Sequence, residues 1–152
     1  MKTILSTIFA LTLILTFGSS TASAATVSAT GLTFGTIVVG NSGNATAAIT
    51  VNAASGTPYT VTLDAGTNYS SGVRNVKSGA TIGASYHLYK DAAHTAEWGD
   101  AGFANTYSGG GAATGVAGTG SGADQLLTVY AAITANTTPG AYNDSVTVTV
   151  NY

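Results

Sequence analysis

The chain has 152 residues, and its 4 Lys and Arg residues against 6 Asp and Glu residues give a net charge of −2, with only 7% of positions charged. So sparse and slightly acidic a charge set excludes nucleic-acid binding and a polybasic membrane patch, because both need clustered Lys and Arg. The absence of cysteine excludes thiol catalysis and thiolate metal sites.

The N-terminus is predicted to be a cleaved secretory leader. A lysine stands at the second position, the apolar run 4–17 is short for a membrane span, and Ala22-Ser23-Ala24 has the small-x-small form of a cleavage site. A buried helix or an uncleaved anchor is the alternative. Cleavage before Ala25 removes residues 1–24 and leaves residues 25–152, enough for one domain with its own core. No later apolar run reaches transmembrane length, so we expect no integral membrane segment after cleavage.

In the first half of this domain the sequence predicts short strands separated by turns. Residues 26–34 alternate loosely and end at Gly35, after which residues 36–40 form a second short strand or continue the first. A turn rich in Asn and Gly precedes a strand at residues 45–53. In residues 59–66 apolar and polar residues alternate cleanly, which predicts a strand with one buried face.

The second half continues the pattern around a Gly-rich segment. Residues 84–91 alternate, with Tyr86 and Leu88 on one face. Residues 108–123 show no periodicity and predict a long loop, and a phosphate-binding loop is disfavoured because no Gly-Lys-Ser/Thr follows. Residues 124–134 then predict another strand.

The final segment, residues 141–152, gives the clearest strand signal in the chain. Some seven short strands without a helical pattern predict an all-β fold, an immunoglobulin-like β-sandwich. Because no later segment covers so regular a strand, we expect an open edge or an unfilled strand position. The residues on one face of the final strand are Val146, Val148, Val150 and Tyr152.

A polar stretch after the strand at 84–91 is the main candidate for chemistry. Asp91, His94, Glu97 and Asp100 recur every three residues and could ligate a hard or borderline metal. That spacing converges only on a helical turn, and the two histidines match no zinc motif. We therefore expect no metal, and interpret the stretch as a loop with solvated charges and Trp98 packed on the sandwich edge.

Catalysis is not expected. There is no G-x-S-x-G turn for a nucleophilic serine. A pair of carboxylates for glycoside cleavage would need Glu97, the only glutamate, with Asp91, Asp100 or a distant aspartate. We predict a protein that is not an enzyme and needs no cofactor.

Arg74 is the sole arginine, and we interpret it as a structural residue. Its neighbours are uncharged except for Lys77. We expect a buried planar donor that ties a loop to backbone carbonyls or to an acid such as Asp64 or Asp91, with a surface position as the alternative.

Several spaced motifs together resemble a known family, the spore coat protein U domain, which is related to archaic chaperone–usher pilus subunits. L-x-F-G begins at Leu32, G-x-x-Y-x-V-x-L at Gly56, Y-x-L-Y at Tyr86 with W-G at Trp98, and G-x-Y-x-D-x-V-x-V-x-V-x-Y at Gly140. In this order they span essentially all of the predicted domain. Each motif alone is weak, and the combination is specific.

The resemblance implies an incomplete sandwich whose last strand is supplied in trans. A periplasmic chaperone would fill the groove first, and the N-terminal extension of another pilus or coat subunit would replace it at an outer-membrane usher. The protein would pass through the periplasm to the cell surface or a fimbrium and serve adhesion or biofilm formation. Val146, Val148, Val150 and Tyr152 would then line the groove or core, and the structural corner would consist of Tyr86, Leu88, Trp98 and Gly99.

Two departures from the family pattern matter. The usual cysteine positions correspond to Ala25 and Ala53, so the stapling disulfide is absent. If cleavage falls before Ala25, little chain remains ahead of the domain to act as a donor strand. This favours a terminal subunit, a coat or surface protein that does not polymerise, or a groove that is closed in some other way.

A different class of function remains as the alternative. Tyr69, Tyr107 and the Gly-rich segment could form a self-contained binding module for a surface or a glycan.

Overall fold

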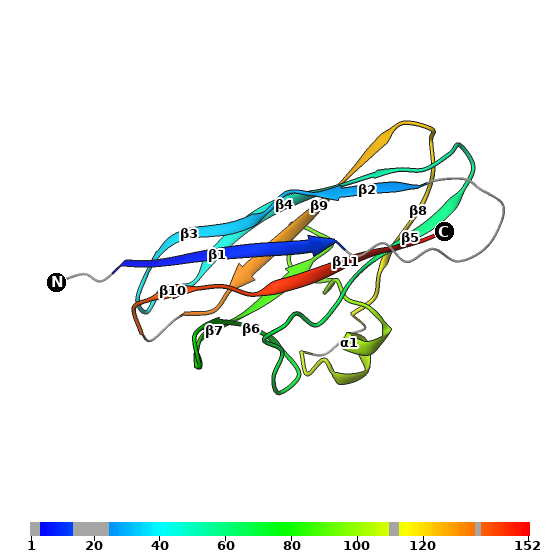
Figure 1. The fold of residues 1–152 in the computed structure, drawn as a ribbon. Helices are drawn as coiled ribbons and strands as arrows, with labels where there is room; N and C mark the ends of the chain where they lie inside the picture. The colour runs from blue at the N-terminus through cyan, green and yellow to red at the C-terminus, as the bar shows by residue number, and fades with distance from the viewer. Residues whose placement is uncertain (1–3, 14–24, 110–112, 136–137) are drawn as a thin grey trace.

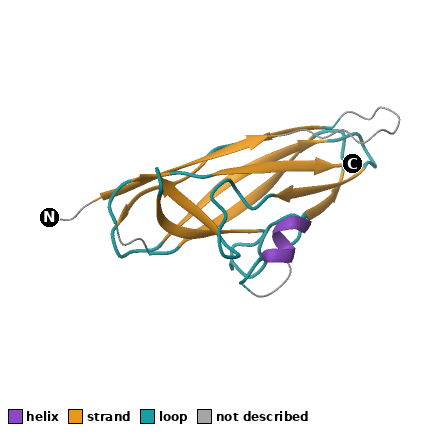
Figure 2. Cartoon of the chain, turned by 60° about the horizontal axis from the view of Figure 1, so that its bottom comes forward, coloured by secondary structure: helices purple, strands orange, loops and turns teal. Residues whose placement is uncertain are grey.

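The structure is a computed structural model that describes residues 4–13, 25–109, 113–135 and 138–152. Two β-sheets pack face to face, and one short helix lies beside them (Figures 1 and 2). The predicted all-β fold, an immunoglobulin-like β-sandwich, is confirmed.

The first sheet combines strands from both ends of the chain. It contains β1 (Ile4–Leu13), β3 (Leu32–Val38), β5 (Pro58–Leu63), β8 (Val116–Thr119), β10 (Ala141–Tyr142) and β11 (Ser145–Asn151). Its order is β10-β1-β11-β5-β8, and β3 pairs with β1 beside this path.

The second sheet is antiparallel throughout. It contains β2 (Thr26–Ala29), β4 (Gly43–Asn52), β6 (Arg74–Ser78), β7 (Thr81–Tyr89) and β9 (Asp124–Ile133). Its order is β2-β4-β9-β7-β6. The central pair runs in unbroken register from Gly43 opposite Ile133 to Asn52 opposite Asp124.

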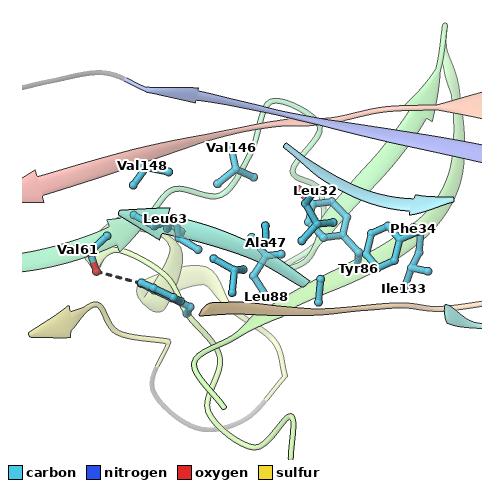
Figure 3. Packing of buried hydrophobic residues seen from close by; sticks show 14 of the residues in the cluster. Leu32, Phe34, Ala47, Val61, Leu63, Tyr86, Leu88, Ile133, Val146 and Val148 are labelled. Atoms are coloured by element: carbon cyan, nitrogen blue, oxygen red, sulfur yellow. Dashed lines mark hydrogen bonds between the residues drawn. The ribbon is translucent and has the colours of Figure 1, made fainter. Parts of the chain in front are cut away.

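Alternating side chains build the core between the sheets. In β11 the three valines are buried, while the polar residues between them are half-buried. Val148 lies opposite Leu63, and Val150 lies opposite Val61 on the neighbouring β5. Figure 3 shows Val148, Leu63 and Val61 in the region between the sheets, where Leu88 of the second sheet also lies. The alternation of apolar and polar residues therefore determines which face of each strand is buried.

Of the two alternatives left open for residues 36–40, the structure shows a strand that continues through Gly35. The structure ends a first short strand at Ala29 and starts β3 at Leu32, which then runs through Gly35 to Val38. Gly35 has a φ of 65°, and the pairing of β3 with β1 shifts register here because Phe34 has no partner. A bulge thus lets the strand continue past Gly35.

The prediction of one long loop over residues 108–123 is wrong in part. β8 lies within it and pairs with β5; residues 110–112 fall outside the described residues. The glycines serve close approach, because a Cβ on Gly118 would lie 2.4 Å from the Tyr59 ring. At this position glycine therefore allows a strand to pack closely against its neighbour, and it does not mark a flexible loop.

A short helix was not predicted either. The helix α1 (Ala101–Thr106) begins at Asp100, whose Oδ1 accepts a hydrogen bond from the Phe103 N–H at 2.6 Å. Six residues are too few to show a helical repeat, so only the capping aspartate marks it in sequence.

Candidate strand-acceptor site

β1 occupies the position between β3 and β11 in the first sheet (Figure 1). It runs antiparallel to β3, with Phe9 opposite Leu32. It runs parallel to β11, with Leu13 opposite Val148. Among the described residues, β3 has no other strand partner. The backbone of residues 4–13 therefore joins β3 to the rest of the first sheet.

Apolar side chains of β11 and β3 lie between the sheets beneath this position. Val146 and Val148 are 0% exposed and Val150 is 2% exposed. Leu32 is 2% exposed and Ile37 is 7% exposed on the other wall. Figure 3 shows Val146, Val148 and Leu32 directed into the space between the sheets. These burials place the valines in the core, and their role in lining an acceptor groove stays a prediction.

The remaining residue of that predicted set differs. Tyr152 is half-buried and lines a shallow surface pocket of about 400 Å³ with Tyr59 and Gly118. The β3 wall was missed as part of the site, although the apolar residues of the Leu32-x-Phe34 motif were its sequence signal.

Of the predicted corner residues, Leu88, Trp98 and Gly99 lie together beside β5. The Tyr86 hydroxyl instead donates to Asp144 beside β11, and the role of the four residues as one structural corner stays a prediction. The Trp98 Nε1–H donates to the Val61 carbonyl at 3.0 Å, a bond drawn in Figure 3. Its backbone N–H donates to the Leu88 carbonyl at 2.6 Å. A Cβ on Gly99 would lie 2.6 Å from a Phe103 ring carbon, so the close packing requires glycine.

Arg74 is buried and holds this corner to the first sheet. Its Nη1 donates to Glu97 Oε1 at 2.9 Å, and its Nη2 donates to the carbonyls of Asp64 at 2.6 Å and Trp98 at 2.9 Å. The guanidinium also lies 4.0 Å from the centroid of the Phe103 ring. Burial lowers the pKa of Arg74, while nearby Tyr86 and Glu97 oppose that shift. The planar guanidinium group binds these partners at the same time, as expected for a buried arginine.

The expectation of a loop with solvated charges is wrong for Glu97. This carboxylate is 4% exposed and accepts from Arg74, from the Leu88 N–H at 3.3 Å and from the His87 imidazole at 3.2 Å. The reason is non-local: Arg74 supplies the charge that makes its burial tolerable.

The other acids of the stretch hold local structure. Asp91 accepts from the N–H groups of Thr95 and Ala96, and these bonds, first that from Thr95, lower the pKa of Asp91. Asp100 caps α1. Within the described ranges, no group of three or more His, Asp or Glu side chains is placed to hold a metal ion.

The tyrosines of the alternative binding module pack onto the helix. Tyr69 and Tyr107 both contact Phe103, with ring centroids 6.1 and 5.2 Å away. The Tyr107 hydroxyl donates to Glu97 Oε2 at 3.5 Å, and burial with the nearby carboxylate raises the pKa of Tyr107 to about 12. Both rings therefore pack beside the corner that contains Trp98 and Gly99.

A second buried acid lies beside β11 and was missed by sequence reasoning. Asp144 is 2% exposed; its Oδ2 accepts from the Tyr86 hydroxyl at 2.6 Å and its Oδ1 from the Asn68 N–H at 2.9 Å. Burial raises the pKa of Asp144, against the effect of these hydrogen bonds. Its aspartate position within the terminal Gly-x-Tyr-x-Asp motif was the only available signal.

Comparison with known proteins agrees with this architecture. A chain in the crystal structure of the CsuC–CsuE chaperone–tip adhesion subunit pre-assembly complex, from the archaic chaperone–usher Csu pili of Acinetobacter baumannii, aligns with a TM-score of 0.60 and 22% identity. The alignment covers 86% of this chain but only 40% of that chain. The likeness establishes a shared fold. No curated protein matches this sequence.

The fold and the strand position define an immunoglobulin-like β-sandwich in which one strand lies between β3 and β11. The family model of the Spore Coat Protein U domain matches residues 11–149, and the chain belongs to that family. No helix among the described residues is long and apolar enough to cross a membrane.

Proposed function

We propose that this chain is an exported structural subunit whose first sheet accepts a β-strand from another polypeptide. One observation carries the proposal: residues 4–13, which belong to the predicted leader, hold the position between β3 and β11. Removal of the leader before Ala25 would leave two neighbouring strand edges without their common partner. Unpaired edges over an apolar interior are a site for strand addition.

The chemistry of the site suits an extended apolar strand. Backbone hydrogen bonds to β3 and β11 would supply pairing, and alternate side chains would meet the core. The residues of β1 in register with buried Leu32, Val146 and Val148 are Phe9, Leu11 and Leu13. A donor should therefore run parallel to β11 and carry apolar residues at alternating positions.

Family membership and the shared fold support particular partners. The similar structure is a chaperone–subunit complex of a chaperone–usher pilus. We assign a periplasmic chaperone as the first strand donor, an outer-membrane usher as the assembly site, and another pilus or coat subunit as the final donor. The protein then acts at the cell surface, in adhesion or biofilm formation, without catalysis.

The test compares the processed chain, residues 25–152, alone and with a synthetic peptide of residues 4–13. The peptide should raise the melting temperature strongly, because it restores the strand that pairs with both β3 and β11. The same peptide with one central residue replaced by proline is the control, since proline removes a backbone donor. A cognate chaperone should act like the peptide.

Two matched variants test whether the peptide binds at the position between β3 and β11. Val148→Thr, on the buried face of β11, should weaken the peptide response, whereas Leu126→Ala, at a 68% exposed residue of β9, should leave it unchanged. The proposal would be contradicted if the processed chain alone is a stable monomer and no added strand changes its melting temperature.

A further inference from the structure

A row of aromatic rings crosses the outer face of the second sheet. Tyr89 on β7 lies opposite Tyr130 on β9, and Tyr130 lies opposite Thr46 on β4. His87 stacks on Tyr89 with ring centroids 5.9 Å apart, and His94 stacks on Tyr89 at 4.9 Å. All four rings are partly exposed. This face is turned away from the space between the sheets, so it is separate from the strand-acceptor site.

His94 is held here in an unfavourable backbone conformation. Its φ is 58°, in the left-handed region, which costs about 1 kcal/mol or more for a residue with a side chain. The turn that imposes it is fixed by Asp91, which accepts from the N–H groups of Thr95 and Ala96. The result is an imidazole placed over Tyr89 at the surface, where core packing does not require it.

A shallow pocket of about 390 Å³ adjoins the ring row. Its lining combines one aromatic face with an amide, a hydroxyl and an imidazole, and it contains no charged side chain. The residues are Asn44, Ala45, Thr46, Ala92, His94 and Tyr130.

We propose that this pocket binds a neutral saccharide. The face of an aromatic ring carries negative charge density and attracts the weakly positive C–H bonds of a pyranose, so Tyr130 supplies the stacking surface. Asn44, Thr46 and His94 supply donors and acceptors for the sugar hydroxyls. The lack of a lining cation disfavours phosphate or carboxylate ligands.

The size and shape of the site fit this class of ligand. Its volume is at the lower end of the range of small-molecule sites, about 300–1,000 Å³. A shallow recess on a flat sheet leaves room for a chain to continue beyond the bound sugar. The proposal therefore concerns short segments of a linear neutral polysaccharide.

The test uses the chain of residues 1–152 and three linear probes: cellotetraose, maltotetraose and mannotetraose. NMR titration should show saturable shifts at the amides of Asn44, Thr46 and Tyr130 with at least one probe. Tyr130→Leu, which keeps an apolar side chain but removes the ring, should weaken binding at least about tenfold. Asn44→Ala changes an exposed residue and should weaken binding without altering the melting temperature.

Tyr69→Phe is the matched control, because Tyr69 packs on Phe103 away from this pocket and should bind as the unmodified chain does. The proposal is overturned if no probe shifts these amides at about 10 mM, a concentration that detects even millimolar affinity. It is also overturned if Tyr130→Leu and Asn44→Ala bind as well as the unmodified chain.

Discussion

Single residues of this protein are stabilised by partners distant in the sequence. Arg74 and Glu97 lie 23 positions apart and form a buried ion pair. Tyr86 and Asp144 lie 58 positions apart and share a buried hydrogen bond. Each pair joins elements that are far apart in the sequence, so no local sequence pattern predicts the contact. A single substitution in either pair should therefore have a large effect on the unfolding free energy.

The first prediction concerns the ion pair. Arg74→Met should lower the unfolding free energy of residues 1–152 by about 3–5 kcal/mol, because it leaves the Glu97 carboxylate buried without its charge partner. Adding Glu97→Gln removes that uncompensated charge and should recover part of the loss. Urea denaturation of both single variants and the double variant measures the coupling; additive losses would contradict a direct interaction.

The second prediction concerns pH. A raised pKa means that folded Asp144 holds its proton more tightly than the unfolded chain does. Its contribution to stability is therefore fully present below the ordinary aspartate pKa of about 4 and is lost as pH rises through the raised pKa. Asp144→Asn keeps a neutral group at all pH values, so the variant should gain stability relative to the unmodified chain across this window.

Denaturation at a series of pH values from about 3.5 to 7 checks this. The exposed Asp124→Asn on β9 serves as the control. An Asp144→Asn difference that stays constant or falls with rising pH would show that the buried carboxyl does not titrate as described.

At the scale of elements, the pairing of β2 with β4 offers a place for a covalent link. Thr26 lies opposite Asn52, so the same register continued by one residue places Ala25 opposite Ala53. Both alanines are buried, at 4% and 0% exposure. These are the positions where the family resemblance placed cysteines.

The third prediction follows from this register. The double variant Ala25→Cys with Ala53→Cys should form a disulfide and raise the unfolding free energy by about 2–4 kcal/mol over its reduced form. Comparing oxidised and reduced protein isolates the bond. Thr26→Cys with Ala53→Cys is one residue out of register and should oxidise poorly; equal gains from both pairs would refute the register.

Elements with a strong local pattern were predictable, and those fixed by distant partners were not. Alternation alone located the strands around Val61, Leu88 and Val148, as well as their buried faces. β6 was missed because the residues Arg-Asn-Val-Lys-Ser are mostly polar, and the partners that allow Arg74 to be buried, such as Glu97 and the Trp98 carbonyl, lie more than 20 positions away. β8 was missed because Gly118, which fits the strand against Tyr59, carries no strand signal.

The candidate site was predictable in part for the same reason. The valines of β11 stand out by their alternation, while the opposite wall on β3 is interrupted by the bulge at Phe34. That a segment from residues 4–13 lies between the two walls could not be derived from either strand alone. Pairing between distant strands depends on the whole topology.

At the scale of the whole molecule, the fourth prediction concerns removal of the N-terminal segment. Residues 25–152 should unfold at a lower temperature than residues 1–152, because β3 and β11 lose the strand between them. The shorter chain should also associate more readily, since exposed strand edges pair with other chains. Calorimetry and analytical ultracentrifugation at several concentrations measure both effects, and equal stability with no association would contradict the role of β1.

The direction of β1 has a mechanical consequence. Its hydrogen bonds to the antiparallel β3 lie perpendicular to the strand and those to the parallel β11 are slanted, so a pull along the strand shears both sets together. Such a pull loads many bonds at once, while lifting one end breaks them singly. A strand seated in this position would therefore resist tension between linked molecules far better than peeling from its end, and two chains joined this way could hold under flow yet exchange partners by stepwise displacement.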